Sequence, residues 1–198
     1  MTSARVAELI PDGAAYAAVY AALPEWRRRK CDALRFDADR RRSAAAWLLV
    51  ERLLADRGLA ASGLTVVENA FGRPEFAEPG SPRFSLSHTR DRVMAAVSDG
   101  PVGCDVETVR PVAEGVCELC LTDAELAVLA GVPEGSARER AFCRLWARKE
   151  SRVKAEGCGL SADLRAFAVL DGDSGPWRFE DFDFGDGTLG CVCRPSSS

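Results

Sequence analysis

The stretch from Trp146 to Leu160, WARKESRVKAEGCGL, decides how the rest of the sequence is interpreted. Apolar residues recur at helical spacing across residues 142–154, which predicts a helix with one face buried against a core. Gly157 and Gly159 follow, and glycine adopts the left-handed conformations that end helices at little cost. The sequence therefore predicts a helix with a glycine-rich exit.

Two charged residues of this helix, Glu150 and Lys154, are four positions apart, so they lie on one face, one turn from each other. Such a pair is usually a solvated salt bridge worth a few tenths of a kcal/mol. It could instead supply an acid and a base to a reactive site. The choice depends on the partners that the rest of the chain provides.

The composition is that of a globular protein, since 47% of the 198 residues are hydrophobic and 28% are charged. This length allows one large domain or two small, fused ones. No apolar run approaches the roughly 20 residues that cross a bilayer. The N-terminal residues 1–13 lack the apolar segment of a secretory signal. We therefore expect a cytoplasmic protein that does not enter a membrane.

The chain contains eight cysteines, which is a high number for its length. In a cytoplasmic protein they are expected to be reduced thiols rather than a disulfide framework. Cys117 with Cys120 and Cys191 with Cys193 could form a four-thiolate zinc site. Each pair also lies in an apolar segment, where a free cysteine packs as a small hydrophobic residue.

The net charge of −4 does not favour nucleic-acid binding. Basic residues are nevertheless concentrated at Arg27–Lys30 and Arg40–Arg42, near the starts of two predicted helices. These clusters could be solvated basic faces. In an acidic protein they also suggest that a compact anionic ligand, rather than a polymer, binds at this corner.

Local patterns predict helices and strands throughout the chain. Residues 12–22 and 39–57 are expected to form helices, and Thr122 with Glu125 makes a capping box for another. Strands are expected at residues 64–68, 83–87, 92–97, 102–107, 164–170, 177–184 and 188–193. Each half carries helices followed by strands, and the halves meet near residues 99–101. This order is consistent with a duplicated architecture.

In the strand at residues 102–107, alternation places Asp105 and Glu107 on one side. Adjacent carboxylates repel each other and favour a nearby cation, unless the strand face is simply exposed. Together with Glu150 they make three carboxylates suited to Mg²⁺. Possible phosphate donors are Arg27, Lys30, Arg73, Ser87, His88, Lys149 and Lys154. A metal with many cationic donors points to a phosphoanhydride substrate.

Four motifs, in order, resemble those of the 4′-phosphopantetheinyl transferases, specifically the larger, two-half type that modifies carrier proteins. GRP at residues 72–74 is similar to the family's G-K/R-P, and FSLSHT at residues 84–89 is similar to its F-x-x-S-H-S/T. VGCDVE at residues 102–107 is similar to its G-x-D-x-E. Residues 146–160 are similar to its W-x-x-K-E-x-x-x-K-x-x-G-x-G-L. The last two motifs together are highly specific.

The resemblance implies an α+β fold, a pseudo-dimer of two similar halves, each a small, mainly antiparallel sheet packed by helices. The N-terminal half, residues 1–100, would contact the nucleotide of coenzyme A. The C-terminal half, residues 101–198, would carry the metal and catalytic motifs. The active site would lie at the junction of the halves, and the protein would be a monomer.

The resemblance also implies a reaction. The enzyme would transfer the 4′-phosphopantetheine group from coenzyme A to a serine of an apo acyl or peptidyl carrier protein, releasing 3′,5′-ADP. Mg²⁺, or alternatively Mn²⁺, would be held by Asp105, Glu107 and Glu150. Glu150 would also be the base for the serine hydroxyl, and Lys154 would contact the transferred phosphate. The carrier proteins would belong to fatty-acid, polyketide or nonribosomal-peptide biosynthesis.

Other residues gain implied roles in the same way. Coenzyme A would be contacted by Arg27, Lys30, Arg42, Arg73, Ser87, His88, Lys149 and Lys154. The carrier would dock between the metal motif and the reactive helix, with Leu119, Leu121, Leu126 and Leu129 as candidates. These leucines could equally be core residues. The alternatives to a transferase are a metal-dependent hydrolase and a non-catalytic binder of coenzyme A-like nucleotides.

Overall fold

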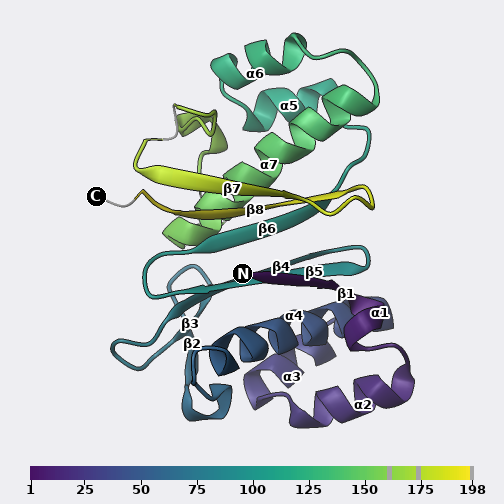
Figure 1. Cartoon of the computed structure of the whole chain (residues 1–198), viewed down its shortest axis with the longest axis vertical. Helices are drawn as coiled ribbons and strands as arrows, with labels where there is room; N and C mark the ends of the chain where they lie inside the picture. Colours follow the sequence, from purple (N-terminus) through teal and green to yellow (C-terminus); the bar gives the residue numbers. More distant parts are fainter. Residues whose placement is uncertain (160–161, 173–174, 197–198) are drawn as a thin grey trace. The chain divides into compact units, whose positions relative to one another are not determined.

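The structure of the protein, a computed structural model, describes residues 1–159, 162–172 and 175–196. The chain divides into two compact units, Met1–Asp99 and Gly100–Ser198. Each unit combines helices with antiparallel strands, so the predicted α+β class is confirmed (Figure 1). Leu160, the last residue of the glycine-rich motif, lies outside the described residues.

The first unit is built on a three-stranded sheet of order β1-β5-β4, in which both strand pairs are antiparallel. Strands β2 and β3 form a separate two-stranded sheet. In chain order the elements are β1 (Thr2–Arg5), α1 (Val6–Leu9), α2 (Gly13–Ala22), α3 (Glu25–Asp32), α4 (Asp37–Ala55), η1 (Ala61–Gly63), β2 (Val66–Glu68), β3 (Pro74–Phe76), β4 (Arg83–Thr89) and β5 (Arg92–Ser98).

Helix α4 supplies the centre of the first core. Trp47 is 1% exposed, and its ring meets Trp26 of α3 and Phe84 of β4 edge-on, with centroids 5.0 Å and 5.7 Å apart. These contacts join two helices and the sheet in one apolar cluster. The predicted helix of residues 39–57 is confirmed, with its start and end two residues earlier in the structure.

The second unit is built on a sheet of order β6-β8-β7, again antiparallel throughout. The long helix α7 packs against β6 and β8. In chain order the elements are β6 (Gly103–Thr108), α5 (Glu114–Cys120), α6 (Asp123–Ala130), α7 (Ser136–Glu156), η3 (Leu164–Ala166), β7 (Trp177–Asp183) and β8 (Thr188–Pro195). A second apolar core lies among α5, α6, α7 and the η3 segment.

Helix α7 contains the helix predicted from the opening motif and extends it at both ends. Gly157 follows the last turn with φ of 76°, and Gly159 has φ of 61°. The expectation that these glycines adopt left-handed backbone conformations is therefore confirmed. The capping box at the start of α6 is confirmed as well, since Glu125 N donates to Thr122 Oγ1 and Thr122 N donates to Glu125 Oε2.

The predicted strand at residues 164–170 is wrong. This segment contains only the short 3₁₀ helix η3. Its backbone groups bind buried side chains instead of a neighbouring strand. Lys149 donates to the carbonyls of Leu164 and Phe167, and Val169 N donates to Glu125. Those bonds satisfy the buried backbone, so no sheet ladder is needed.

The two units share one strand connectivity. In each three-stranded sheet, the first strand is followed by helices and later by two consecutive strands that pair with each other, and the last of these lies between the other two. In the first unit, β2 and β3 come before that pair. The description of each half as a small antiparallel sheet packed by helices fits this observation. A pseudo-dimer stays a prediction. Among the described residues no helix has the length and apolar character needed to cross a membrane.

Candidate active site

The site begins with the close approach of strand β6 to helix α7. A Cβ atom at Gly103 would lie 1.8 Å from the carbonyl oxygen of Ser151 and 2.5 Å from the amide nitrogen of Ala155. Only glycine fits there, so the two backbones are in direct contact. Asp105 and Glu107 lie on the same face of β6 as Gly103 and therefore face α7.

Asp105 and Lys154 form an ion pair across this contact, with Lys154 Nζ 2.6 Å from Asp105 Oδ1. Asp105 is buried, whereas 29% of the Lys154 side chain is exposed. Burial lowers the pKa of Lys154, but the Asp105 carboxylate, with contributions from Cys104 and Glu150, outweighs it, and the net pKa is raised. The lysine therefore keeps its proton at neutral pH while part of it reaches solvent.

Two further carboxylates respond to the charge of Asp105. Glu107 accepts a hydrogen bond from Trp146 Nε1 at 3.2 Å, and its pKa is raised by burial and then by Asp105. The pKa of Glu150 is raised as well, mainly by burial. The charge of Lys154 lowers this pKa, and the charge of Asp105 raises it. Lys154 and, at Glu107, Arg110 only partly offset the charge of these three carboxylates, and a bound cation would offset the excess negative charge.

The chemistry of this donor set suits Mg²⁺, which takes carboxylate oxygens and keeps room for phosphate oxygens and water. The donors are not gathered around one point. In the part of the chain that the structure describes, no three His, Cys, Asp or Glu side chains lie close enough together to hold a metal ion. Binding of one ion by Asp105, Glu107 and Glu150 together therefore requires these side chains to move.

The four-thiolate zinc site is not formed by the described residues. Cys117 and Cys120 lie in α5 and Cys191 and Cys193 in β8, all as buried free thiols. Burial raises the pKa of Cys120 to about 11 and that of Cys193 to about 12. Because zinc binds the thiolate, these environments disfavour it. The cysteines act as small packed side chains.

A cavity of about 150 Å³ lies beside Glu107. Val112, Val116, Phe142 and Trp146 form its apolar walls. Glu107, Thr108 and Arg110 supply its polar groups, and Cys143 completes the lining. The carboxylate site therefore adjoins an apolar surface, formed in part by α5 and α7, that could receive an uncharged part of a substrate.

Comparison with known proteins identifies the family. A sequence model of the 4′-phosphopantetheinyl transferase superfamily matches residues 101–193, a range that contains β6, α7 and the carboxylate site. The chain belongs to the 4′-phosphopantetheinyl transferase superfamily. The match lies within the second unit.

Several curated 4′-phosphopantetheinyl transferases are similar to this chain. The psf-1 protein of Bacillus pumilus is 29% identical over 75% of this chain and 64% of its own length. Sfp of Bacillus subtilis strain 168 is 26% identical over 72% of this chain and 64% of its own length. AcpT of Salmonella typhimurium is 36% identical over 64% of this chain and 66% of its own length. The chain thus spans about two thirds of the length of these transferases.

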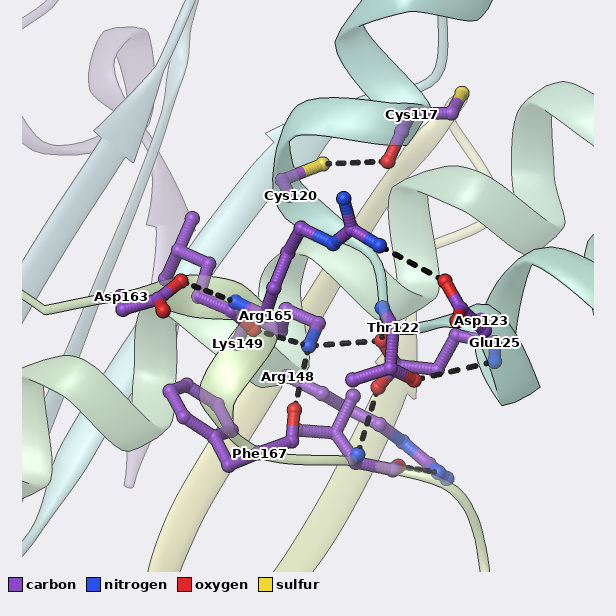
Figure 2. A network of polar contacts seen from close by, with 12 residues as sticks. Cys117, Cys120, Thr122, Asp123, Glu125, Arg148, Lys149, Asp163, Arg165 and Phe167 are labelled. Carbon is purple, nitrogen blue, oxygen red and sulfur yellow. Dashed lines mark hydrogen bonds and ion pairs between the residues drawn. The ribbon is translucent and has the colours of Figure 1, made fainter.

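One predicted coenzyme A contact is corrected. Lys149 is completely buried and forms an ion pair with Glu125, also completely buried, at 2.8 Å. It donates to the Leu164 and Phe167 carbonyls at 2.6 Å and 2.7 Å (Figure 2). Burial lowers the pKa of Lys149, against the opposing effect of Glu125. In this chain, the motif therefore places a core lysine next to Glu150 and not a second phosphate donor.

In the first unit, the prediction that Arg27 contacts coenzyme A is also corrected. Arg27 is 4% exposed and donates to the Ser43 carbonyl through Nε at 3.0 Å and Nη2 at 2.6 Å, which ties α3 to α4. Burial lowers its pKa to about 10. Lys30 is accessible, with 39% of its side chain exposed, and pairs with Glu68 at 2.8 Å. It lines a surface pocket of about 490 Å³ with Trp26.

Arg42 and Arg73 keep positions from which a ligand could be bound. Arg42 pairs with Asp39 within α4 and donates to the Arg90 carbonyl at 2.7 Å. Arg73 follows Gly72, whose φ of 78° the β2–β3 turn requires, and its Nη2 donates to the Phe84 carbonyl at 3.2 Å. Both side chains are partly exposed.

Ser87 and His88 are consecutive residues of β4, so their side chains lie on opposite faces of the strand. His88 is exposed and lies on the face of Phe84 and Leu86, whereas Ser87 is 8% exposed. Phe84 and Leu86 belong to the first core. The prediction that Ser87 stands beside His88 on one ligand therefore does not fit this geometry, although His88 stays accessible.

The four docking candidates divide by exposure. Leu119 of α5 is 79% exposed. Leu121 and Leu129 are 0% and 5% exposed and belong to the second core, so they are corrected from docking candidates to core residues. Leu126 is half-buried against the same core.

Sequence reasoning missed two residues that shape the site. Trp146 lies in the apolar stripe that the sequence predicts to face a core, yet its indole nitrogen also donates a hydrogen bond to Glu107. Glu125 was interpreted only as a capping residue, yet it is the buried counter-ion of Lys149. A capping box is a local pattern, and nothing in it indicates that the same carboxylate receives a lysine from a distant helix.

Proposed function

We propose that this chain is a 4′-phosphopantetheinyl transferase that moves 4′-phosphopantetheine from coenzyme A to a serine hydroxyl of an apo acyl or peptidyl carrier protein. The observation that carries the proposal is the Asp105–Lys154 ion pair with Glu107 and Glu150 beside it, within the residues matched by the superfamily. The curated relatives that bear the transferase name support the general reaction.

Each residue of the site has a proposed task. Mg²⁺, or alternatively Mn²⁺, would be held by Asp105, Glu107 and Glu150 and would neutralise charge on the pyrophosphate of coenzyme A. The raised pKa of Glu150 suits it to accept the proton of the serine hydroxyl. The ammonium of Lys154, held protonated by Asp105, suits the contact with the transferred phosphate.

The remaining residues proposed to contact the substrates are those whose side chains are accessible to solvent. Lys30, Arg42, Arg73 and His88 are the first-unit residues proposed to contact coenzyme A, since each is at least partly exposed. Carrier binding is proposed at α5 and α6, where Val116, Leu119 and Val128 are 42%, 79% and 51% exposed. The cavity beside Glu107 adjoins Val116 and would receive apolar parts of either substrate.

The proposal includes the two-half type of transferase, a cytoplasmic location and a monomeric state. Its test is the mass of an apo carrier protein incubated with this protein, coenzyme A and Mg²⁺. The expected product is a carrier heavier by one phosphopantetheine group, with one 3′,5′-ADP released per carrier. Chelation of the metal is expected to stop the reaction. Free phosphopantetheine with an unmodified carrier would identify a hydrolase instead, and binding without turnover would identify a non-catalytic module.

A further inference from the structure

The Lys149–Glu125 pair is a fully buried, fully hydrogen-bonded polar network (Figure 2). The three donors of the Lys149 ammonium match three acceptors, namely Glu125 Oε2 at 2.8 Å and the carbonyls of Leu164 and Phe167. Glu125 also accepts from the backbone amides of Thr122 and Val169, each at 2.8 Å. The proposed phosphoryl-transfer chemistry uses neither side chain.

The network joins three segments that are distant in sequence. Lys149 belongs to α7, Glu125 lies in the first turn of α6, and their backbone partners lie in residues 164–169. The η3 part of that last segment packs against α5. The same pair therefore holds both α6 and, through η3, α5 to the middle of α7.

Apolar contacts alone would hold these segments less specifically. The surrounding core consists of residues such as Leu121, Leu129 and Val169, whose packing has no preferred direction. Hydrogen bonds between buried charged groups are directional, and a fully satisfied buried network specifies one arrangement. Lys149 is also covalently adjacent to Glu150, so α6 is fixed to the turn of α7 that carries the proposed base.

We propose that the Lys149–Glu125 pair is a positioning device for the acceptor protein: it sets the place of the α5–α6 surface relative to Glu150. The inference rests on the proposed function, because α5–α6 is the proposed carrier-docking surface. It adds two positioning residues to that function, neither of which touches a substrate.

The main test variant is Lys149→Met/Glu125→Leu, which removes both charges and keeps apolar volume in the core. The matched control is Arg148→Met, one position earlier on α7. Arg148 is 8% exposed and binds Asp181 of β7 at 2.7 Å, and it also binds Asp171 and the Val169 carbonyl, each at 2.9 Å. It therefore links α7 to β7 and to residues 169–171, and it does not bind Glu125. In this control Lys149 still binds the Leu164 and Phe167 carbonyls, and Glu125 still binds Val169 N. Should the double variant fail to fold, Glu125→Asp provides the same measurement, because it keeps both charges and only shortens the side chain that reaches Lys149.

Two measurements are expected to distinguish a positioning role of the pair from a role in the stability of the fold alone. In the pair variant, amide hydrogen exchange in residues 114–130 should become about tenfold faster, and KM for the apo carrier should rise about tenfold, equivalent to ~1.4 kcal/mol. KM for coenzyme A should stay within about twofold of the wild-type value, because the Lys149–Glu125 pair positions the carrier-docking surface and not the proposed coenzyme A contacts. The Arg148→Met control should change neither the α5–α6 exchange nor the carrier KM.

Three results would overturn the inference. These are unchanged exchange in α5–α6, a parallel rise of both KM values, or equal effects in the Arg148→Met control. Failure of the proposed function is recognised separately, because the wild-type protein would then modify no carrier. The exchange measurement would still decide in that case whether the pair fixes α5–α6 to α7.

Discussion

Lys149 and Glu150 are neighbours in the sequence with opposite environments. Successive residues of an α-helix point about 100° apart, so one can enter the core while the next borders the carboxylate site. The sequence pattern allowed Glu150 to be placed correctly beside Lys154 on one face of α7. It could not place Lys149, because the burial of that lysine depends on Glu125, a residue of another helix.

Removing one member of the buried pair should cost far more than removing a surface ion pair. Lys149→Met leaves the Glu125 carboxylate buried without its cation, and the free energy of unfolding should fall by about 3–5 kcal/mol. The control is Arg165→Met, because Arg165 pairs with Asp123 at a site where both side chains are largely exposed. In Arg165→Met, the free energy of unfolding measured by urea denaturation should fall by less than about 1 kcal/mol. Equal losses in the two variants would contradict the assignment.

The raised pKa values of Glu107 and Glu150 predict the sign of a pH effect. A carboxyl group with a higher pKa in the folded state binds its proton more tightly there, so its ionisation destabilises the fold as pH rises. Glu107→Gln and Glu150→Gln should therefore raise Tm at pH 7 in metal-free buffer, and the gain should vanish below about pH 4. The exposed Glu118→Gln serves as the control. A gain that does not depend on pH would argue against this electrostatic origin.

Among the elements, those that carry the family motifs could be predicted well. The 3.6-residue period located α7, the two-residue alternation located β6, and glycine marked the end of α7. The local sequence pattern gave a wrong prediction for residues 164–170. Their apolar residues suggested a strand, but buried side chains bind the backbone of this segment. Strand β1, only four residues long, was missed because it is defined by its pairing with β5.

The contact of β6 with α7 makes Gly103 a sensitive position. Gly103→Ala would place a methyl group 1.8 Å from the Ser151 carbonyl, so the strand and helix must separate. The free energy of unfolding should fall by about 3 kcal/mol or more. Gly115→Ala, in α5 with no atom within 4 Å of the new Cβ, should be neutral or slightly stabilising. Denaturation curves that do not distinguish these variants would contradict the direct backbone contact.

The exposed face of α5 offers a test of docking. Leu119→Glu changes a residue that is 79% exposed, so stability should change by no more than about 0.5 kcal/mol. The kcat/KM for the carrier should fall about tenfold if α5 contacts it, which corresponds to ~1.4 kcal/mol. Leu129→Ala, in the core, should instead cost about 2–5 kcal/mol of stability. Unchanged carrier kinetics in Leu119→Glu would place docking elsewhere.

For the whole molecule, the order of motifs along the sequence was sufficient to indicate the family, and the comparisons agree with it. The repeated order of helices and strands predicts a duplicated architecture, which stays a prediction, and the chain divides into two units after Asp99. The sequence could not show that Asp105 pairs with Lys154, because that contact requires β6 and α7 to pack together. It also could not separate the buried arginine Arg27 from the accessible Lys30 in one basic cluster.

The carboxylates and the lysine of the second unit are proposed to carry out the transfer of phosphopantetheine. The most direct test of this proposal is the mass spectrum of an apo carrier protein after incubation with coenzyme A, Mg²⁺ and either wild-type protein or a folded Asp105→Asn or Glu150→Gln variant. We predict a carrier heavier by one phosphopantetheine group with the wild type and at least about a hundredfold lower rate with each variant. An unmodified carrier with the wild type, or full modification by both variants, would contradict the account.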